Sequence, residues 1–218
     1  MTDQNRGLFI VLEGGDGAGK TTQLSLLEQW LTQRGVTVER TREPGGTPIG
    51  ERIRALVLEH GHGEVDPRTE ALLFAASRAA HVQQRILPAL RRGALVLCDR
   101  YVDSSVAYQG VGRGLGAAAI AELNDWATSG LTPDLTVVLD IDPAVSRARQ
   151  AQRDGGAADR MESADDTFRA SLRAAFLDRA AAEPQRYLVV DAAAEPAQIH
   201  QQIQVRLQPM LKNSAVAL

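Results

Sequence analysis

Short apolar runs divide the chain into segments, and longer stretches with helical spacing lie between them. The runs cover Leu8–Glu13, Val36–Arg42, Ala94–Cys98, Leu135–Ile141 and Tyr187–Val190. Several are apolar at consecutive positions, which is typical of strands buried on both faces of a parallel sheet. Because these runs alternate with helical segments, the pattern predicts an α/β fold with a five-stranded parallel sheet flanked by helices.

The segments between the runs carry signals for the beginnings and ends of helices. After the first run, helical spacing relates Leu24, Leu27 and Leu31. Gly35 then provides a stop. Asp66 followed by Pro67 predicts the start of a long helix. Pro88 should bend or end this helix before Arg91. Further helices are expected over Gly116–Thr128, Asp165–Ala182 and Ala197–Leu211, followed by a frayed tail.

Composition places limits on the class of protein. The 218 residues, of which 44% are hydrophobic, suit one domain spanning residues 1–218. A net charge of −3 argues against a basic surface for nucleic acid. Cys98 is the single cysteine, so no intrachain disulfide can form. With no signal peptide and no apolar run of about 20 residues, we expect a cytoplasmic protein that does not contact membranes.

A glycine-rich stretch directly after the first predicted strand carries the clearest chemistry. It satisfies the pattern GxxxxGK[ST] with Gly14, Gly15, Asp16, Gly17, Ala18, Gly19, Lys20 and Thr21. In such a loop the backbone N–H groups and the following helix N-terminus surround phosphate oxygens. Lys20 is expected to reach the β- and γ-phosphates of ATP, and the Thr21 hydroxyl to help hold Mg²⁺.

A second Mg²⁺ ligand is expected on an acid at the end of an apolar strand. Asp99 follows one such run and Asp140 ends another, and both remain candidates. Asp99 is preferred, because Arg100 beside it is a second residue of a type that binds phosphate.

The phosphate-binding loop alone does not identify the acceptor. The Asn-Lys-x-Asp motif that reads guanine in GTPases is missing from a chain whose only lysines are Lys20 and Lys212. The length suits a kinase of small acceptors.

Four further stretches narrow the choice. They are "TREPGGTPIGERIR" (41–54), "LLFAASRAAHV" (72–82), "CDRYVDSSVAYQGVGRG" (98–114) and "QRDGGAADRMES" (152–163). Together with "EGGDGAGKTTQ" they resemble the bacterial thymidylate kinases, which use ATP and Mg²⁺ to phosphorylate dTMP. The resemblance implies a P-loop NTPase fold with a short mobile lid over about residues 150–163, and a homodimer.

The resemblance also implies a dTMP site. Phe74 and Arg78 share one helix face and resemble residues that stack on thymine and bind its O4 side. Arg54 and Arg100 resemble ligands of the acceptor phosphate. The other residues expected in the dTMP site are Asp16 near the sugar 3′-hydroxyl, Glu43 lining the site, Ser105 and Gln109 bordering the base, and Tyr108 beside the deoxyribose. Asp16 should turn away from ATP, because its charge repels phosphate.

The lid is expected to supply catalytic charge. Where some relatives carry an arginine in the phosphate-binding loop, this chain has Gly17, so a cation must come from elsewhere. The family pattern Asp-Arg-x-Glu favours Arg160, with Arg153 second, and Gly155 and Gly156 between them allow hinge motion.

Weaker features receive structural interpretations. The stretch "GVGRGLG" (110–116) is expected to be a flexible connector, His81 a packing or surface residue, and Trp30 and Trp126 packing residues. Two functional alternatives stay open: a kinase of another deoxynucleotide, and a nucleotide sensor that has lost turnover.

Overall fold

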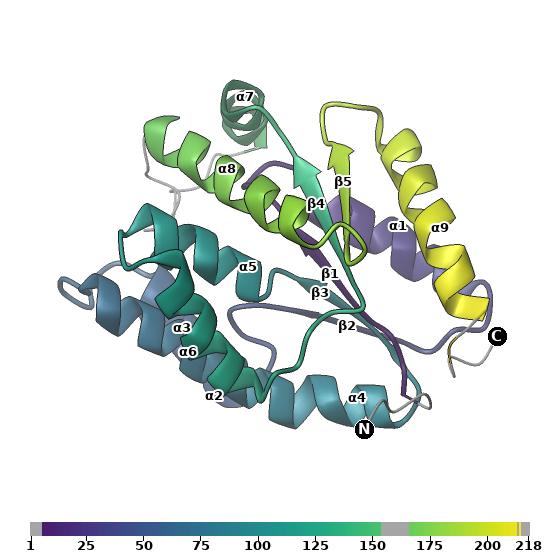
Figure 1. Ribbon diagram of the computed structural model, residues 1–218, viewed down its shortest axis with the longest axis horizontal. Coiled ribbons are helices and arrows are strands. Elements are labelled where there is room, and N and C mark those ends of the chain that lie inside the picture. The colour runs from purple at the N-terminus through teal and green to yellow at the C-terminus, as the bar shows by residue number, and fades with distance from the viewer. Residues whose placement is uncertain (1–5, 154–165, 213, 215–218) are drawn as a thin grey trace.

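The computed structural model describes residues 6–153, 166–212 and 214. Its centre is a five-stranded parallel sheet in the order β2-β3-β1-β4-β5 (Figure 1). The strands are β1 (Phe9–Glu13), β2 (Val38–Arg42), β3 (Leu95–Asp99), β4 (Leu135–Asp140) and β5 (Tyr187–Asp191). Each lies within two residues of the predicted run, so the predicted sheet is confirmed.

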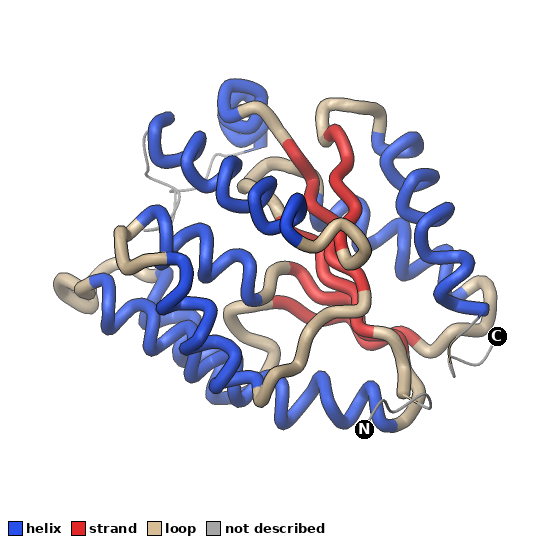
Figure 2. The backbone as a smooth tube through the Cα atoms, in the orientation of Figure 1, coloured by secondary structure: helices blue, strands red, loops and turns tan. Residues whose placement is uncertain are grey.

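Helices surround the sheet (Figure 2). They are α1 (Lys20–Thr32), α2 (Pro48–Leu58), α3 (Pro67–His81), α4 (Leu87–Arg91), α5 (Val102–Ser105), α6 (Ala117–Thr128), α7 (Pro143–Arg153), α8 (Asp166–Ala182) and α9 (Pro196–Lys212). Two π-helical turns, η1 (Val82–Ile86) and η2 (Val106–Gly112), continue α3 and α5. Asp66 accepts hydrogen bonds from the first backbone N–H groups of α3, as its N-cap role predicts.

Each face of the sheet packs against its own layer of helices. On β1, Ile10 and Leu12 pack with α1 and α9, whereas Phe9 and Val11 pack with η1 and α4. On the second face α8 adds a further cluster over β4. Side chains of a strand alternate between its two faces, so burial on both sides requires the consecutive apolar residues seen in the sequence.

The long helix does not end at Pro88. Pro88 lies in the first turn of α4, where its missing N–H and fixed φ are tolerated, and η1 precedes it. The α-helix gives way to the π-helical turn η1 just before Pro88, and the helical segment then continues to Arg91, so the proline does not end it.

Two structural interpretations of the sequence are wrong. Trp126 is 82% exposed, whereas Trp30 is buried as expected. Residues 110–112 of the supposed connector belong to η2. A Cβ on Gly112 would come within 2.5 Å of the Phe168 ring, so this glycine allows η2 to pack closely against α8.

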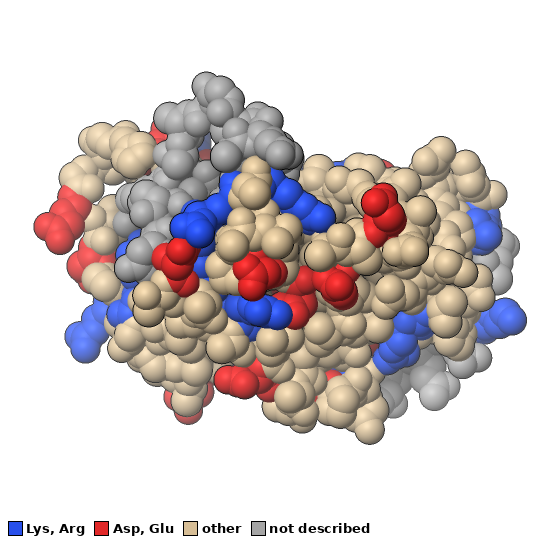
Figure 3. All heavy atoms as spheres, turned by 90° about the horizontal axis from the view of Figure 1, so that it is seen from above, with Lys and Arg blue, Asp and Glu red and all other residues tan. Residues whose placement is uncertain are grey.

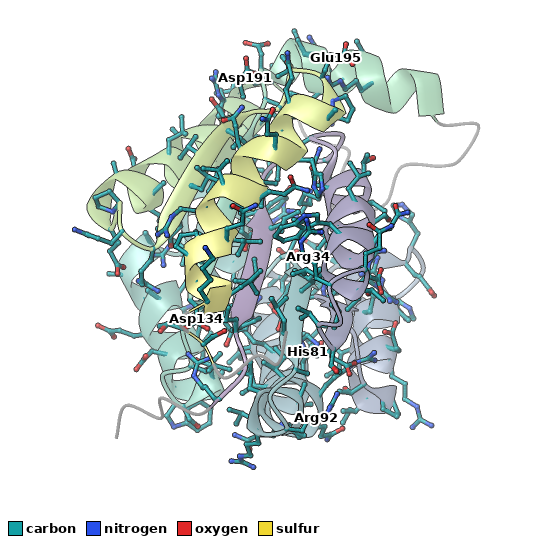
Figure 4. The ribbon with its side chains drawn as sticks, turned by 90° about the vertical axis from the view of Figure 1, so that its right-hand side faces the viewer. Arg34, His81, Arg92, Asp134, Asp191 and Glu195 are labelled. Atoms are coloured by element: carbon teal, nitrogen blue, oxygen red, sulfur yellow. The ribbon has the colours of Figure 1, made fainter. Side chains whose placement is uncertain are left out.

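The two ends of the sheet differ in what they carry. Asp134 lies at the amino end of β4 and binds Arg6, whereas Asp191 and Glu195 lie at the opposite, carboxyl end (Figure 4). The carboxyl end also carries the glycine-rich loop after β1, which is where ligands bind in open α/β sheets. Within the described residues, no helix is both long and apolar enough to cross a membrane.

The helix α9 offers a test of this packing. Leu207 is buried and Val205, two residues away, is 66% exposed. Leu207→Ala is expected to lower the free energy of unfolding by roughly 2–5 kcal/mol, because it leaves a cavity in the core. Val205→Ala should stay within about 0.5 kcal/mol. Urea unfolding of both variants measures the difference, and equal losses would contradict the assigned orientation of α9.

Candidate active site

A cleft of about 450 Å³ opens between the glycine-rich loop, α3 and η2. Figure 3 shows the molecule from above the view of Figure 1, which is the side towards which the strands point. Positive and negative side chains are interspersed on this face. Most residues of the predicted site line the cleft, namely Asp16, Gly17, Gly19, Lys20, Thr21, Glu43, Arg54, Phe74, Arg78, Asp99, Arg100, Ser105, Tyr108 and Gln109. The loop and the base pocket predicted from separate parts of the sequence therefore share one space.

The loop after β1 depends on glycine conformations. Gly14 has φ 131°, and a Cβ there would lie 2.5 Å from the carbonyl oxygen of Leu139. Gly19 has φ 92° and directly precedes α1. Lys20 Nζ donates to the carbonyl oxygens of Gly14 and Gly15 at 3.0 and 2.9 Å. Burial lowers the pKa of Lys20, and the nearby positive charge of Arg100 lowers it further.

Arg100 lies between the loop and the rest of the cleft. Its backbone has φ 68°, which is unusual for a residue with a side chain. Nη1 donates to Gly14 O and to Ser104 Oγ, both at 3.1 Å, while Nη2 pairs with Asp16. Its guanidinium also lies 5.4 Å from the centre of the Tyr108 ring.

The structure shows what Asp16 contacts. Its carboxylate binds Arg100, and Tyr108 donates to it from 3.3 Å. Burial by itself would raise the pKa of Asp16, but Arg100 and Lys20 outweigh this and lower it to about 2. Asp16 is therefore ionised at neutral pH. Attraction to these cations holds the Asp16 carboxylate in place. The sequence-based expectation for Asp16 considered only its repulsion from the phosphates of ATP.

Glu13 is a residue that the sequence interpretation missed. It ends β1 and is fully buried. Its carboxylate accepts hydrogen bonds from the backbone N–H groups of Tyr101 and Ser104 at 2.8 and 3.2 Å, and from Ser104 Oγ at 2.6 Å. These bonds hold the turn that follows Arg100. An acid at the end of an otherwise apolar run was the available signal.

The two candidate acids for a metal ligand have different surroundings. Asp140 forms hydrogen-bonded ion pairs with Arg173 at 2.5 and 2.8 Å. Asp99 lines the cleft, and its buried Oδ1 accepts no hydrogen bond from any described residue. A buried carboxylate oxygen without a partner is unfavourable, so Asp99 has capacity for a ligand that Asp140 lacks.

The far end of the cleft is formed by α3. Phe74 is half-buried there, and Arg78 is 2% exposed. Arg78 donates to Glu43 at 2.6 Å, to Ser105 Oγ at 2.9 Å and to Tyr101 O at 3.0 Å, and it also contacts Asn124 Oδ1. A guanidinium has five N–H groups, so these four contacts leave one N–H for a ligand.

Arg78 is held by Glu43, and Glu43 is in turn held by His81. Glu43 Oε1 lies 2.9 Å from His81 Nδ1, and His81 Nε2 lies 2.6 Å from Thr41 Oγ1. Although burial opposes it, Arg78 and His81 lower the pKa of Glu43. His81, labelled in Figure 4, is therefore a buried partner of the site and not only a packing residue. Asn124, which also contacts Arg78, was missed, because it lies outside the stretches that carry the family resemblance.

The remaining predicted residues fall into two groups. Arg54 donates to Pro44 O at 3.0 Å, which places it at the cleft wall beside Glu43. The predicted lid, about residues 150–163, lies mainly outside the described residues. Arg160 is among those outside, and for Arg153 only the backbone at the end of α7 is described.

The parallel sheet, the glycine-rich loop that caps α1, and the adjoining pocket define a P-loop nucleotide-binding protein of the α/β class. A sequence model of the thymidylate kinase family matches residues 12–203. The chain belongs to the thymidylate kinase family.

Individual relatives agree with this assignment. The chain is 51% identical over 205 residues to the thymidylate kinase of Cutibacterium acnes, covering 94% of this chain and 98% of the other. It is 55% identical over 204 residues to that of Leifsonia xyli, with coverage of 92% and 94%. The crystal structure of thymidylate kinase from Ehrlichia chaffeensis aligns with a TM-score of 0.74 at 34% identity, covering 93% of this chain and 99% of that one.

The environment of Glu13 generates a prediction about stability and pH. Burial, together with repulsion from Asp103, raises the pKa of Glu13 from 4.5 to about 7. Between these values the folded protein retains a proton at Glu13 that the unfolded chain has lost. The stability contributed by this proton is therefore complete below pH 4.5 and is lost as the pH rises through 7.

Glu13→Gln removes this titration. The free energy of unfolding of the variant, minus that of the wild type, is expected to rise between pH 4.5 and 7 and to be level outside that range. Denaturant unfolding at a series of pH values measures it. The exposed Glu64→Gln serves as the control and should show no such rise. Parallel curves for Glu13→Gln and wild type would contradict the raised pKa.

Proposed function

We propose that this protein transfers the γ-phosphate of ATP to dTMP, giving dTDP for the synthesis of dTTP. The observation that carries this proposal is the continuous cleft, in which the phosphate-binding loop at one end faces Phe74 and Arg78 at the other. In this proposal two nucleotides occupy the cleft and meet at their phosphates, with Arg100 between them. Membership of the thymidylate kinase family supports dTMP as the acceptor.

The proposed mechanism depends on position and charge. The attacking atom is an oxygen of the dTMP phosphate, so no side-chain nucleophile is needed. Lys20 binds the β- and γ-phosphates of ATP, and Arg100 and Arg54 bind the acceptor phosphate. Asp16 keeps Arg100 oriented before the substrates arrive, and orientation in advance lowers the barrier to transfer.

Mg²⁺ is part of this proposal. The Thr21 hydroxyl and the Asp99 carboxylate are the residues that would hold it, and the unpartnered Asp99 Oδ1 suits a hard cation that prefers oxygen ligands. When bound, the ion neutralises charge on the transferring phosphoryl group.

At the acceptor end, Phe74 stacks on thymine and the remaining N–H of Arg78 donates to its O4 side. Ser105 and Gln109 border the base, Glu43 supports Arg78, and Tyr108 packs beside the deoxyribose. Tyr108 donates a hydrogen bond to Asp16, and this contact supports the role proposed for Asp16 near the 3′-hydroxyl, since Tyr108 is the residue proposed to pack beside the deoxyribose.

The catalytic lid remains a prediction from the sequence. We assign the cation that assists transfer to Arg160, with Arg153 second. The ion pair of Arg147 with Asp166 at 2.7 Å joins α7 to α8 on the two sides of this segment, and it supports a lid anchored at both ends.

A homodimer in the cytoplasm completes the proposal. The helices α2 and α3 pack together, and each carries exposed large apolar side chains, namely Ile49 and Leu56 on α2 and Leu72 on α3. Three exposed apolar side chains on one helix pair support an interface there.

An acceptor panel tests the function. Purified protein with ATP and Mg²⁺ is offered dTMP, dUMP, dCMP, dAMP, dGMP and thymidine, and formation of each phosphorylated product is followed. Turnover is expected to be fastest with dTMP. A clear preference for another acceptor would replace dTMP in the proposal, and ADP release without any acceptor would end the kinase interpretation.

The two lysines of the chain provide a matched pair of variants. Lys20→Ala removes the charge expected at the β- and γ-phosphates, so kcat with dTMP should fall by roughly 10²-fold or more. Lys212→Ala, at the end of α9, should leave kcat unchanged. Thermal unfolding checks that both variants are folded. Normal turnover by folded Lys20→Ala would remove Lys20 from the mechanism.

A further inference from the structure

A second buried carboxylate lies behind the base pocket. Glu70, in the first turn of α3, is fully buried, and Gln109 of η2 is 1% exposed. Gln109 Nε2 donates to Glu70 Oε1 at 3.0 Å. Arg113 also approaches Glu70, with Nε and Nη2 each 3.3 Å from one of its oxygens. Glu70 is thus an ion-paired carboxylate with Gln109 as an additional donor.

This contact determines which end of the Gln109 amide faces the cleft. An ionised carboxylate only accepts hydrogen bonds, so the –NH₂ group of Gln109 must point at Glu70. The carbonyl oxygen then points the other way. Gln109 lines the cleft, and among the described residues none donates a hydrogen bond to this oxygen. The cleft is therefore lined both by this amide oxygen and by Arg78, which retains one N–H.

We infer that Glu70 is a specificity-determining residue, because it fixes Gln109 as a hydrogen-bond acceptor that selects bases with a ring N–H. Thymine and uracil carry a donor at N3 next to the acceptor O4, which complements this pair. Cytosine presents the reverse pattern, an acceptor at N3 next to a donor at N4. A buried acceptor facing another acceptor is costly, so a cytosine base is rejected. The inference rests on the proposed function, since it takes the cleft to be the pyrimidine site.

The test compares dTMP with 5-methyl-dCMP, which keeps the 5-methyl group and differs only at the N3–C4 edge. Binding of each is measured by titration calorimetry without ATP, and kcat/KM is measured in parallel with ATP. In the wild type dTMP should bind much more tightly. In Glu70→Gln the amide of Gln109 is free to turn over, so the preference for dTMP is expected to fall about tenfold or more. KM for ATP should not change.

Two further variants separate orientation from a general structural role. Glu70→Asp keeps an acceptor-only partner and should retain the preference even where affinity falls. The double variant Glu70→Gln, Gln109→Glu exchanges the two side chains. The amide introduced on α3 then donates to the carboxylate introduced on η2, and the second oxygen of that carboxylate again faces the base. This double variant keeps the net charge and should regain the wild-type preference. It also repeats the test in case Glu70→Gln does not fold.

The outcomes are distinct. Equal losses for both nucleotides in folded Glu70→Gln, or a double variant without the preference, would overturn the role of Glu70. So would a wild type that binds both nucleotides equally. A wild type that binds dTMP selectively but transfers no phosphate would instead overturn the proposed function and leave the role of Glu70 standing, because calorimetry does not require turnover.

Discussion

Glu13 has no access to solvent at the end of the central strand, so its carboxylate must be satisfied by neighbouring groups. The groups that satisfy it all belong to the turn after β3: two backbone N–H groups and the Ser104 hydroxyl. This requirement ties the strand that leads into the phosphate-binding loop to the strand that leads into Arg100. Arg100, with its unusual backbone, lies directly before this turn, and Ser104 also accepts a hydrogen bond from its Nη1, so the same turn helps to hold the Arg100 side chain.

From that turn, charge pairing extends through the cleft. Arg100 binds Asp16, and Arg78 binds Glu43, so two of the cations of the site already have anionic partners inside the protein. A buried charge without a partner would be strongly unfavourable, and paired charges are also held in one orientation. Asp99 differs from these acids, because one of its oxygens has no partner among the described residues. Ion pairs within the protein therefore hold the side chains of Arg100 and Arg78 in position, whereas the unpartnered oxygen of Asp99 can accept a bond from a ligand.

Much of this protein could be predicted from the sequence. Short runs rich in apolar residues indicated five strands, and all five appear in the sheet. The glycine pattern located the phosphate-binding loop, and Asp66 with Pro67 located the start of α3. These signals are local: strand burial, helix capping and glycine conformations depend on residues within a few positions of one another. Residues from distant stretches that line the cleft were also named in advance, because those stretches resemble the bacterial thymidylate kinases.

Other features were decided only by the tertiary structure. Glu13 and Ser104 are 91 positions apart, Arg78 and Glu43 are 35 apart, and Gln109 and Glu70 are 39 apart. No local pattern names such partners, because they depend on how α3 and η2 pack against each other and against the sheet. The exposure of Trp126 has the same origin, since a tryptophan on a helix is buried only where another element covers that face. The sequence by itself determined the sheet, the loop and the residue types of the site. Packing between distant elements decided which of their hydrogen bonds are used within the protein and which remain for a ligand, because a buried polar group takes its partner from whatever the fold brings within about 3 Å.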